Sequence, residues 1–304
     1  MTFFEKLEKR ISSVDSILCL GLDPRESELE DFSTSEHFDL FYDHYVIKQK
    51  EGSFKITERS SIYVQLRLFC QYILDSTIEH VCCVKPNLAF FIAHLAQGIE
   101  ALLDICLYLK KLEIPVLIDA KLGDIGSTTE YYKKFIFESL MADACTINVF
   151  LGTDVLQAMT TSSEGEYKNT IFALALCSNP SSTEFQGALL ANTKPMYMEV
   201  VEKCETFLKG KSPHSLCGYV VGATYVDVIK DIRERYQNCY FLVPGIGTQG
   251  GDLHSVLSHG LNSKGRGLIV PISRAITNAK DPGQSAKHWK EEIRTCIQHL
   301  KKSN

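Results

Sequence analysis

Two acidic residues and a lysine, Asp119, Lys121 and Asp124, lie within six positions, directly after the apolar run 114–118. Side chains alternate between the two faces of a strand, so we expect Asp119 and Lys121 to point to the same side. Charges at the exit of a buried strand cost desolvation free energy unless they pair or do chemistry. A fixed ammonium beside a carboxylate can stabilise developing negative charge and deliver a proton. A purely structural ion-pair cluster would contain the same residue types, so the pattern alone leaves both interpretations open.

The composition predicts a globular chain with a substantial core and no surplus of positive charge. The chain has 304 residues, of which 45% are hydrophobic, and its formal net charge is −5 at pH 7. This length suits one large domain, and we expect a single domain over 1–304. Without basic residues in excess to neutralise a phosphate backbone, nucleic acid is not an expected partner. Small anionic substrates are not excluded, because local charge governs their binding.

The cysteines and the apolar segments indicate the compartment. The chain contains 11 cysteines but no C-x-x-C pair, and most of them lie inside apolar runs. We interpret them as reduced thiols packed in a core, which implies a reducing compartment. The first ten residues carry both charge signs and no signal-type apolar run, and no segment reaches the ~18 consecutive apolar residues of a membrane span. The sequence therefore predicts a cytoplasmic protein without membrane contact.

Eight short apolar runs alternate with segments of helical periodicity, which indicates a parallel sheet covered on both faces. Eight such repeats favour closure into a (β/α)8 barrel, the TIM barrel. An open, doubly wound sheet is the alternative. It would need a glycine-rich turn after the first strand, and the sequence at 21–24, Gly-Leu-Asp-Pro, is not one. The expected strands are 17–23, 80–85, 115–121, 144–150, 170–178, 216–222, 239–244 and 267–273.

Helices fill the spaces between these strands, and an extra helical insertion, 25–62, follows the first of them. Within this insertion we expect the charged stretch 48–58 to be a solvated loop between two helices. Trp289, in the last helix, is expected to pack in the core. The expected helices are 38–50, 61–79, 90–111, 128–141, 152–162, 191–209, 224–236, 250–260 and 284–302.

In a barrel of this kind the catalytic and binding residues lie at the carboxyl ends of the strands. The expected strands deliver polar and charged residues to that one mouth from unrelated parts of the chain. Such convergence is more specific than any single motif. In chain order the residues are Asp23, Lys85, Asn87, Asp119, Lys121, Asp124, Ser178, Pro244, Gln249, Ser273 and Arg274.

The ordered set of motifs resembles that of the orotidine 5′-phosphate decarboxylase family, in its longer-chain subgroup. The motifs are Gly-Leu-Asp-Pro at 21–24, Val-Lys-Pro-Asn at 84–87, Asp-Ala-Lys-x-Gly-Asp-Ile-Gly-Ser-Thr at 119–128, Ser-Asn-Pro at 178–180, Pro-Gly-Ile-Gly-x-Gln-Gly-Gly-Asp at 244–252 and Ser-Arg at 273–274. The resemblance implies decarboxylation of orotidine 5′-monophosphate to uridine 5′-monophosphate (UMP), the last step of de novo UMP synthesis. It also implies that neither a metal nor an organic cofactor takes part.

The resemblance further implies a role for each site residue. Lys121 would donate a proton to C6 of the pyrimidine and Asp119 would lie against the substrate carboxylate, with Lys85 and Asp124 completing the charged set. The segment with Asp124, Ile125 and Thr128 would reach into the neighbouring subunit's site, which implies a homodimer with shared active sites. Association with orotate phosphoribosyltransferase, the preceding enzyme, is left open. The implied substrate contacts are Asp23 and Asn87 at the ribose, Ser178 at the pyrimidine, and Gln249 and Arg274 at the phosphate. Pro244 and Ser273 are also implied to bind the substrate.

Residue chemistry alone supports some of these assignments better than others. Glycines at 245, 247, 250 and 251 would let the backbone approach a phosphate, and Arg274 offers a planar, bidentate donor. The same glycines could instead form only a tight turn. The pair Asp23-Pro24 commonly starts a turn, and Ser178 could equally cap a helix.

Two positions depart from the subgroup pattern. Leu122 stands where an arginine is usual, and 271–272 (Pro-Ile) replaces more polar residues before the Ser-Arg pair. We expect Leu122 to point away from Lys121 and to have little effect on the chemistry. We expect Pro271 to affect how the loop after the last strand positions Arg274.

Two other functions stay open at this point. A metal-dependent sugar-phosphate enzyme, such as a hexulose-phosphate synthase or a ketogulonate-phosphate decarboxylase, shares the D-x-K-x-x-D motif. Those enzymes place a magnesium-binding carboxylate at the end of the second strand, where this chain has Lys85, and an ammonium there would oppose a divalent cation. The second alternative is a non-catalytic nucleotide-binding module on a degenerate barrel.

Overall fold

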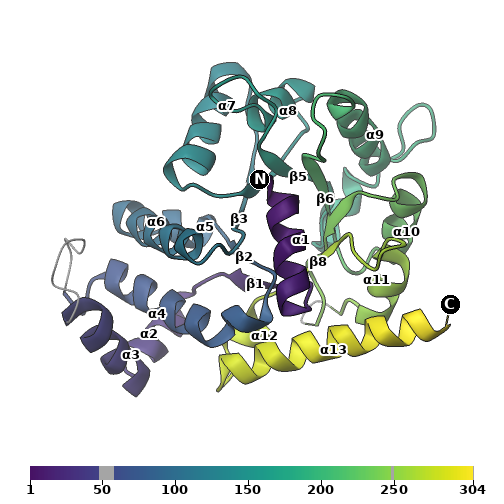
Figure 1. Ribbon diagram of the computed structural model, residues 1–304. Coiled ribbons are helices and arrows are strands. Elements are labelled where there is room, and N and C mark those ends of the chain that lie inside the picture. Colours follow the sequence, from purple (N-terminus) through teal and green to yellow (C-terminus); the bar gives the residue numbers. More distant parts are fainter. Residues whose placement is uncertain (48–57, 248–249, 304) are drawn as a thin grey trace.

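The computed structural model describes residues 1–47, 58–247 and 250–303, and its centre is a barrel of eight parallel strands (Figure 1). The strands are hydrogen-bonded in the order β2-β1-β8-β7-β6-β5-β4-β3. Isolated parallel bridges, Val84 to Val116 and Asn87 to Asp119, join β2 to β3 and close the circle. The predicted (β/α)8 barrel is therefore confirmed. The strands are β1 (Leu18–Leu22), β2 (Cys83–Pro86), β3 (Leu117–Leu122), β4 (Ala144–Ile147), β5 (Thr170–Leu176), β6 (Cys217–Val221), β7 (Tyr240–Leu242) and β8 (Leu268–Ile272).

The strands form where the sequence has short apolar runs, and helices cover the outside of the barrel. Every residue of β1, β2, β4, β6, β7 and β8 is buried, as expected for parallel strands covered on both faces. The helices that follow the strands are α4 (Ile62–Thr77), α5 (Ala89–Ile92), α6 (Leu95–Lys111), α7 (Gly126–Lys133), α8 (Thr153–Thr160), α9 (Met196–Leu208), α10 (Val226–Arg235), α11 (Leu253–Gly260), α12 (Arg274–Thr277) and α13 (Pro282–Ser303).

Helix α1 (Phe3–Val14), which the sequence reasoning did not predict, closes the amino-terminal end of the barrel. The Thr2 hydroxyl accepts a hydrogen bond from the Glu5 N–H, and the Glu5 carboxylate accepts one from the Thr2 N–H, so the helix begins with a capping box. Phe3 and Phe4 pack against Phe172 of β5, and Phe4 stacks on Tyr240 of β7. Figure 1 shows α1 lying inside the ring of outer helices.

The insertion after β1 is helical, as predicted. It contains α2 (Glu26–Ser33), α3 (Glu36–Phe41) and a π-helical segment η1 (Tyr42–Ile47) before α4. The predicted loop at 48–58 lies outside the described residues, except for its last position. Figure 1 places α2 and α3 beside α4, at the edge of the barrel.

The predicted helix 128–141 is observed as α7 followed by a π-helical segment, η3 (Lys134–Ser139), and two other predicted helices differ further from the observed ones. The segment 90–111 is divided into α5 and α6, and Leu95, at the break, has a left-handed backbone with φ of 53°. Helix α9 begins at Met196 rather than near 191, because an antiparallel bridge joins Leu189 to Pro195 just before it.

Among the described residues, no helix is both long and apolar enough to cross a membrane. All 11 cysteines lie within the described ranges, and each is a free thiol.

Candidate active site

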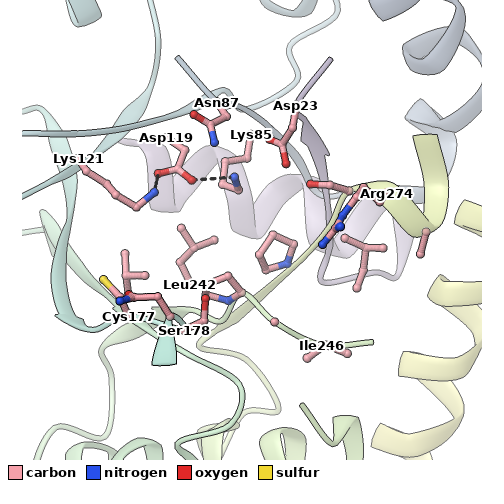
Figure 2. A pocket seen from close by; sticks show the side chains of 18 of the residues that line it. Asp23, Lys85, Asn87, Asp119, Lys121, Cys177, Ser178, Leu242, Ile246 and Arg274 are labelled. Carbon is pink, nitrogen blue, oxygen red and sulfur yellow. Dashed lines mark hydrogen bonds and ion pairs between the residues drawn. The ribbon is translucent and has the colours of Figure 1, made fainter. Parts of the chain in front are cut away.

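A cavity of about 420 Å³ opens at the carboxyl ends of the strands (Figure 2). Its lining combines an apolar wall, which includes Val220, Leu242 and Ile272, with charged groups from several strands. In Figure 2, Lys121 lies at one end of the cavity and Arg274 at the other. Nine residues predicted from the sequence line this cavity: Asp23, Lys85, Asn87, Asp119, Lys121, Ser178, Pro244, Ser273 and Arg274.

Asp119 is ion-paired with two lysines, one on each carboxylate oxygen. Nζ of Lys85 lies 3.0 Å from Oδ2, and Nζ of Lys121 lies 2.5 Å from Oδ1. The Lys85 and Asp119 side chains are only 7% and 12% exposed, whereas Lys121 is 47% exposed and faces the open cavity. The arrangement therefore fixes one lysine in the wall and leaves the other accessible to a bound molecule.

Ion pairing holds Asp119 and Lys85 in their charged forms. Burial favours the neutral carboxyl, but the positive charges of Lys85 and then Lys121 outweigh it and lower the pKa of Asp119 well below its usual range. Burial likewise favours neutral Lys85, but Asp119 and Asp23 raise the pKa of that ammonium above its ordinary value. Opposite charges at short distance therefore dominate over desolvation in this cluster.

The meeting of Asp119 and Lys121 depends on an irregular strand rather than on simple alternation. The β3–β4 register shifts between Ile118 and Leu122, and Lys121 has a left-handed backbone with φ of 51°. The Thr146 hydroxyl of β4 accepts hydrogen bonds from the N–H groups of Ala120 and Lys121, both at 2.9 Å, and donates one to Oδ1 of Asp119. Thr146 therefore stabilises the irregularity that brings the Lys121 ammonium to the carboxylate.

The pyrimidine end that the resemblance implied contains Cys177 and Ser178, directly after β5. The β5–β6 register shifts between Leu174 and Leu176, and the Cys177 N–H donates to Oε1 of Gln186 at 2.7 Å instead of to a strand. A side chain on Gly222 would bring a β-carbon within 2.7 Å of Cα of Ser178, so only glycine permits this close approach. Ser178 is thus held from two sides.

At the implied ribose position, Oδ1 of Asp23 is buried and has no hydrogen-bond partner within the described part of the chain. Buried polar atoms normally have partners, so this oxygen is available to a ligand hydroxyl. Asn87 lies nearby in Figure 2 and its Oδ1 accepts from the Ala89 N–H at 3.2 Å.

Pro271 fits the barrel because the pairing between β7 and β8 ends before it. That ladder comprises only Phe241 with Leu268 and Leu242 with Ile269. The Val270 N–H donates to Ile17 on the other side. A proline at the next position removes no ladder hydrogen bond, and Ser273 and Arg274 follow it into the cavity.

Comparison with known proteins decides the family. Residues 16–289 match the model of the Orotidine 5′-phosphate decarboxylase / HUMPS family. The chain belongs to this family. It is 33% identical over 307 residues to the orotidine 5′-phosphate decarboxylase of Thermomicrobium roseum, across 99% of this chain and 97% of that protein. It is 35% identical over 279 residues to the enzyme of Roseiflexus castenholzii, across 92% and 90% of the two chains.

A solved structure of the orotidine 5′-phosphate decarboxylase family has the same architecture. The crystal structure of Plasmodium berghei orotidine 5′-monophosphate decarboxylase superposes with a TM-score of 0.88 at 31% identity, covering 98% of this chain and 99% of that one. Full-length coverage agrees with the longer-chain subgroup that the motifs indicated.

Three of the residues that the resemblance implicated do not line this chain's own cavity. Asp124, Ile125 and Thr128 follow β3 but lie outside the lining, and Ile125 is 60% exposed. Oδ1 of Asp124 accepts from the Ile125 N–H at 2.8 Å. Gln249 lies outside the described residues.

The structure also adds residues that sequence reasoning missed. Thr146 and Gln186 hold the backbone on which Lys121 and Ser178 stand, and Arg25 lines the cavity two positions after Asp23. Arg25 could have been suspected, because it extends the motif at 21–24. No group of three or more potential metal ligands is found among the described residues.

Proposed function

We propose that this carboxy-lyase of the orotidine 5′-phosphate decarboxylase family releases CO2 from C6 of orotidine 5′-monophosphate, and that Lys121 supplies the proton that replaces it. The observation that carries the proposal is the paired charge of Asp119, with buried Lys85 on one oxygen and accessible Lys121 on the other. A proton donor beside a fixed carboxylate is what this reaction requires.

The reaction places a negative charge on a ring carbon with little resonance stabilisation. When the bond between C6 and the carboxylate breaks, the electron pair stays on C6 and CO2 departs. The Lys121 ammonium lies where it can stabilise this charge and then transfer a proton to C6, which yields UMP. Asp119 would lie against the substrate carboxylate, and the crowding of like charges is relieved as CO2 leaves. Lys85 keeps Asp119 ionised and fixed in position.

The remaining lining residues would bind the nucleotide. Asp23, with its unpartnered buried oxygen, and Asn87 would hold the ribose hydroxyls. Ser178 and Pro244 would contact the pyrimidine. Arg274, at the opposite end of the cavity, would bind the phosphate together with Ser273, which lines the same cavity. The resemblance adds Gln249 to this group.

We also propose a homodimer with shared sites, and the residues that the single chain leaves exposed support it. Asp124, Ile125 and Thr128 would complete the neighbouring subunit's cavity, because they do not line their own. The adjacent loops after β4 and β5 expose Phe150 (77%) and Phe185 (75%). Large apolar side chains gathered on neighbouring loops are typical of an interaction surface.

A metal-dependent relative in the same family fits the site less well. The two oxygens of Asp119 are occupied by the ammonium groups of Lys85 and Lys121. A divalent cation on this carboxylate would meet two positive charges at contact distance and lose most of its electrostatic stabilisation.

Loss of orotidylate absorbance tests the function. The unaltered protein should convert orotidine 5′-monophosphate to UMP in excess chelator, and Lys121→Ala should not. Activity abolished by chelator would support the metal-dependent alternative. Tight UMP binding without turnover in either protein would support a nucleotide-binding module.

Three interpretations of the sequence stay predictions: the single domain over 1–304, the cytoplasmic location and the association with orotate phosphoribosyltransferase.

A further inference from the structure

Trp289, on α13, lies beside Gly247 in the loop between β7 and α11. Ile246 of the same loop lines the cavity on the side where Arg274 lies (Figure 2). A β-carbon built on Gly247 would lie 3.3 Å from Cη2 and 3.5 Å from Cζ2 of the indole, so the ring lies directly beside the loop at Gly247 and leaves little room for a side chain there. Gly247 has φ of 80°, a conformation that other residues rarely adopt. The ring is partly buried and packs beside the core, and Trp289 is the single tryptophan of the chain.

The described residues of this loop have few side chains that could stabilise its conformation. Gly245 and Ile246 line the cavity, and Ile246 is the one large side chain among 245–247 and 250–251. Two backbone hydrogen bonds cross the loop, from Gly250 N–H to Gly247 O and from Gly251 N–H to Gly245 O, both 3.1 Å. Glycine-rich backbone loses much conformational entropy when it is ordered, so packing from outside the loop must contribute.

That packing comes from two sides. A β-carbon on Gly251 would lie 2.4 Å from Cβ of Ala223, so the loop touches the chain after β6 there. Trp289 covers it at Gly247. The described residues of the loop therefore lie beside Ala223 and Trp289, and of these two residues only Trp289 has a large, rigid side chain.

We infer that Trp289 is a positioning residue for the phosphate of the nucleotide: it holds the backbone at 245–247 in the wall of the cavity, opposite the charged cluster. This inference rests on the proposed function and names the part of the substrate that the contact serves. Trp289 does not itself line the cavity, so its effect would be transmitted through the loop backbone.

Removal of the ring should matter only for substrates that carry the phosphate. Trp289→Ala is expected to lower kcat/KM for orotidine 5′-monophosphate about tenfold, because a misplaced loop forfeits phosphate binding. The value for orotidine, the same compound without its phosphate, should stay within about twofold of the unaltered protein. Trp289→Phe keeps a planar ring and should restore most of the lost efficiency.

Ile297→Ala is the matched control, because Ile297 also packs beside the core from α13 but lines a separate small cavity. It should change stability without distinguishing the two substrates. A merely structural role for Trp289 would lower kcat/KM for both substrates alike, and that result, or no change at all, would overturn the inference.

A measurement on the unaltered protein gives an independent readout. The emission of the single tryptophan should change on titration with UMP and stay constant on titration with uridine. Emission that does not change with UMP, or that changes equally with UMP and with uridine, would also overturn the inference. The proposed function fails separately, if the unaltered protein does not turn over orotidine 5′-monophosphate.

Discussion

The hydroxyl of Thr146 donates a hydrogen bond of 2.9 Å to Oδ1 of Asp119, from one strand of the barrel to the next. The Thr146 hydroxyl oxygen also accepts hydrogen bonds from the N–H groups of Ala120 and Lys121. A threonine hydroxyl has one donor and two acceptor sites, so this one is fully used. One small buried side chain therefore fixes both the carboxylate of Asp119 and the backbone that directs Lys121 toward it.

Thr146→Val should impair turnover strongly, although the substitution hardly changes the size of the side chain. Valine keeps the shape of threonine but removes all three hydrogen bonds, and two backbone N–H groups are left without their acceptor. We expect kcat to fall at least about tenfold and the free energy of unfolding to fall by about 1–3 kcal/mol. Steady-state kinetics and denaturant unfolding measure the two effects. Thr146→Ser retains the hydroxyl and is the control, and an unchanged kcat in the valine variant would contradict the assigned role.

The contrast between Asp119 and Thr146 explains what sequence reasoning could and could not reach. Asp119 is conspicuous because a charge at the end of an apolar run is costly, and parallel strands deliver such residues to one mouth. Thr146 lies inside a short apolar strand, where nothing in the spacing distinguishes it from a packing residue. Thr146 matters because Lys121 has a left-handed backbone conformation, and no local sequence pattern predicts that conformation.

Other parts of the fold divide in the same way. Strands were predictable because a buried parallel strand is a continuous apolar run bounded by polar residues. Helix α1 was missed although Phe3, Leu7 and Ile11 have helical spacing, because a barrel repeat does not require a helix before its first strand. Gln186 could not be assigned a role from the sequence. The Cys177 N–H becomes available as its hydrogen-bond partner only through a register shift in β5.

Replacement of Lys85 should have a pH-dependent effect on stability. The lowered pKa of Asp119 means that its ion pairs stabilise the folded state above the unfolded pKa of about 3.9, and that this stabilisation is lost as the pH falls through the folded value. Lys85→Met removes the stronger of the two attractions, so the pKa of Asp119 should rise. The difference in Tm between the unaltered protein and this variant should therefore be larger at pH 7 than at pH 3.

Thermal unfolding across this pH range, without substrate, measures the difference. Lys9→Met is the control, because Lys9 is exposed and pairs with exposed Glu113, so it removes the same formal charge without touching the cavity. A Tm difference that is constant from pH 3 to pH 7 would show that Lys85 does not govern the ionisation of Asp119.

Gln186 should affect recognition of the base rather than of the sugar phosphate. Gln186→Leu leaves the Cys177 N–H without its acceptor, which costs about 1–3 kcal/mol where the group is buried. The backbone just before Ser178 is then expected to shift. We expect UMP to bind about tenfold more weakly and ribose 5-phosphate, which lacks the base, to bind as before. Calorimetric titration with both ligands measures this, and Gln186→Glu, which keeps the acceptor oxygen, should lose less. Equal weakening of both ligands would count against the assignment.

Two inactive variants should restore activity when they are mixed, if the subunits share sites. Lys121 lines its own chain's cavity, whereas Asp124 does not, so a dimer of Lys121→Ala with Asp124→Ala contains one site with both residues intact. Random exchange makes half of the dimers mixed, each with one working site of two, so about one quarter of the unaltered activity should return. Asp119 and Lys121 are ion-paired within one chain, so a mixture of Asp119→Ala with Lys121→Ala should recover nothing. Subunit exchange is checked by native mass spectrometry. An absence of recovery in the first mixture, with exchange verified, would refute the shared site and leave Asp124 with a role in its own subunit.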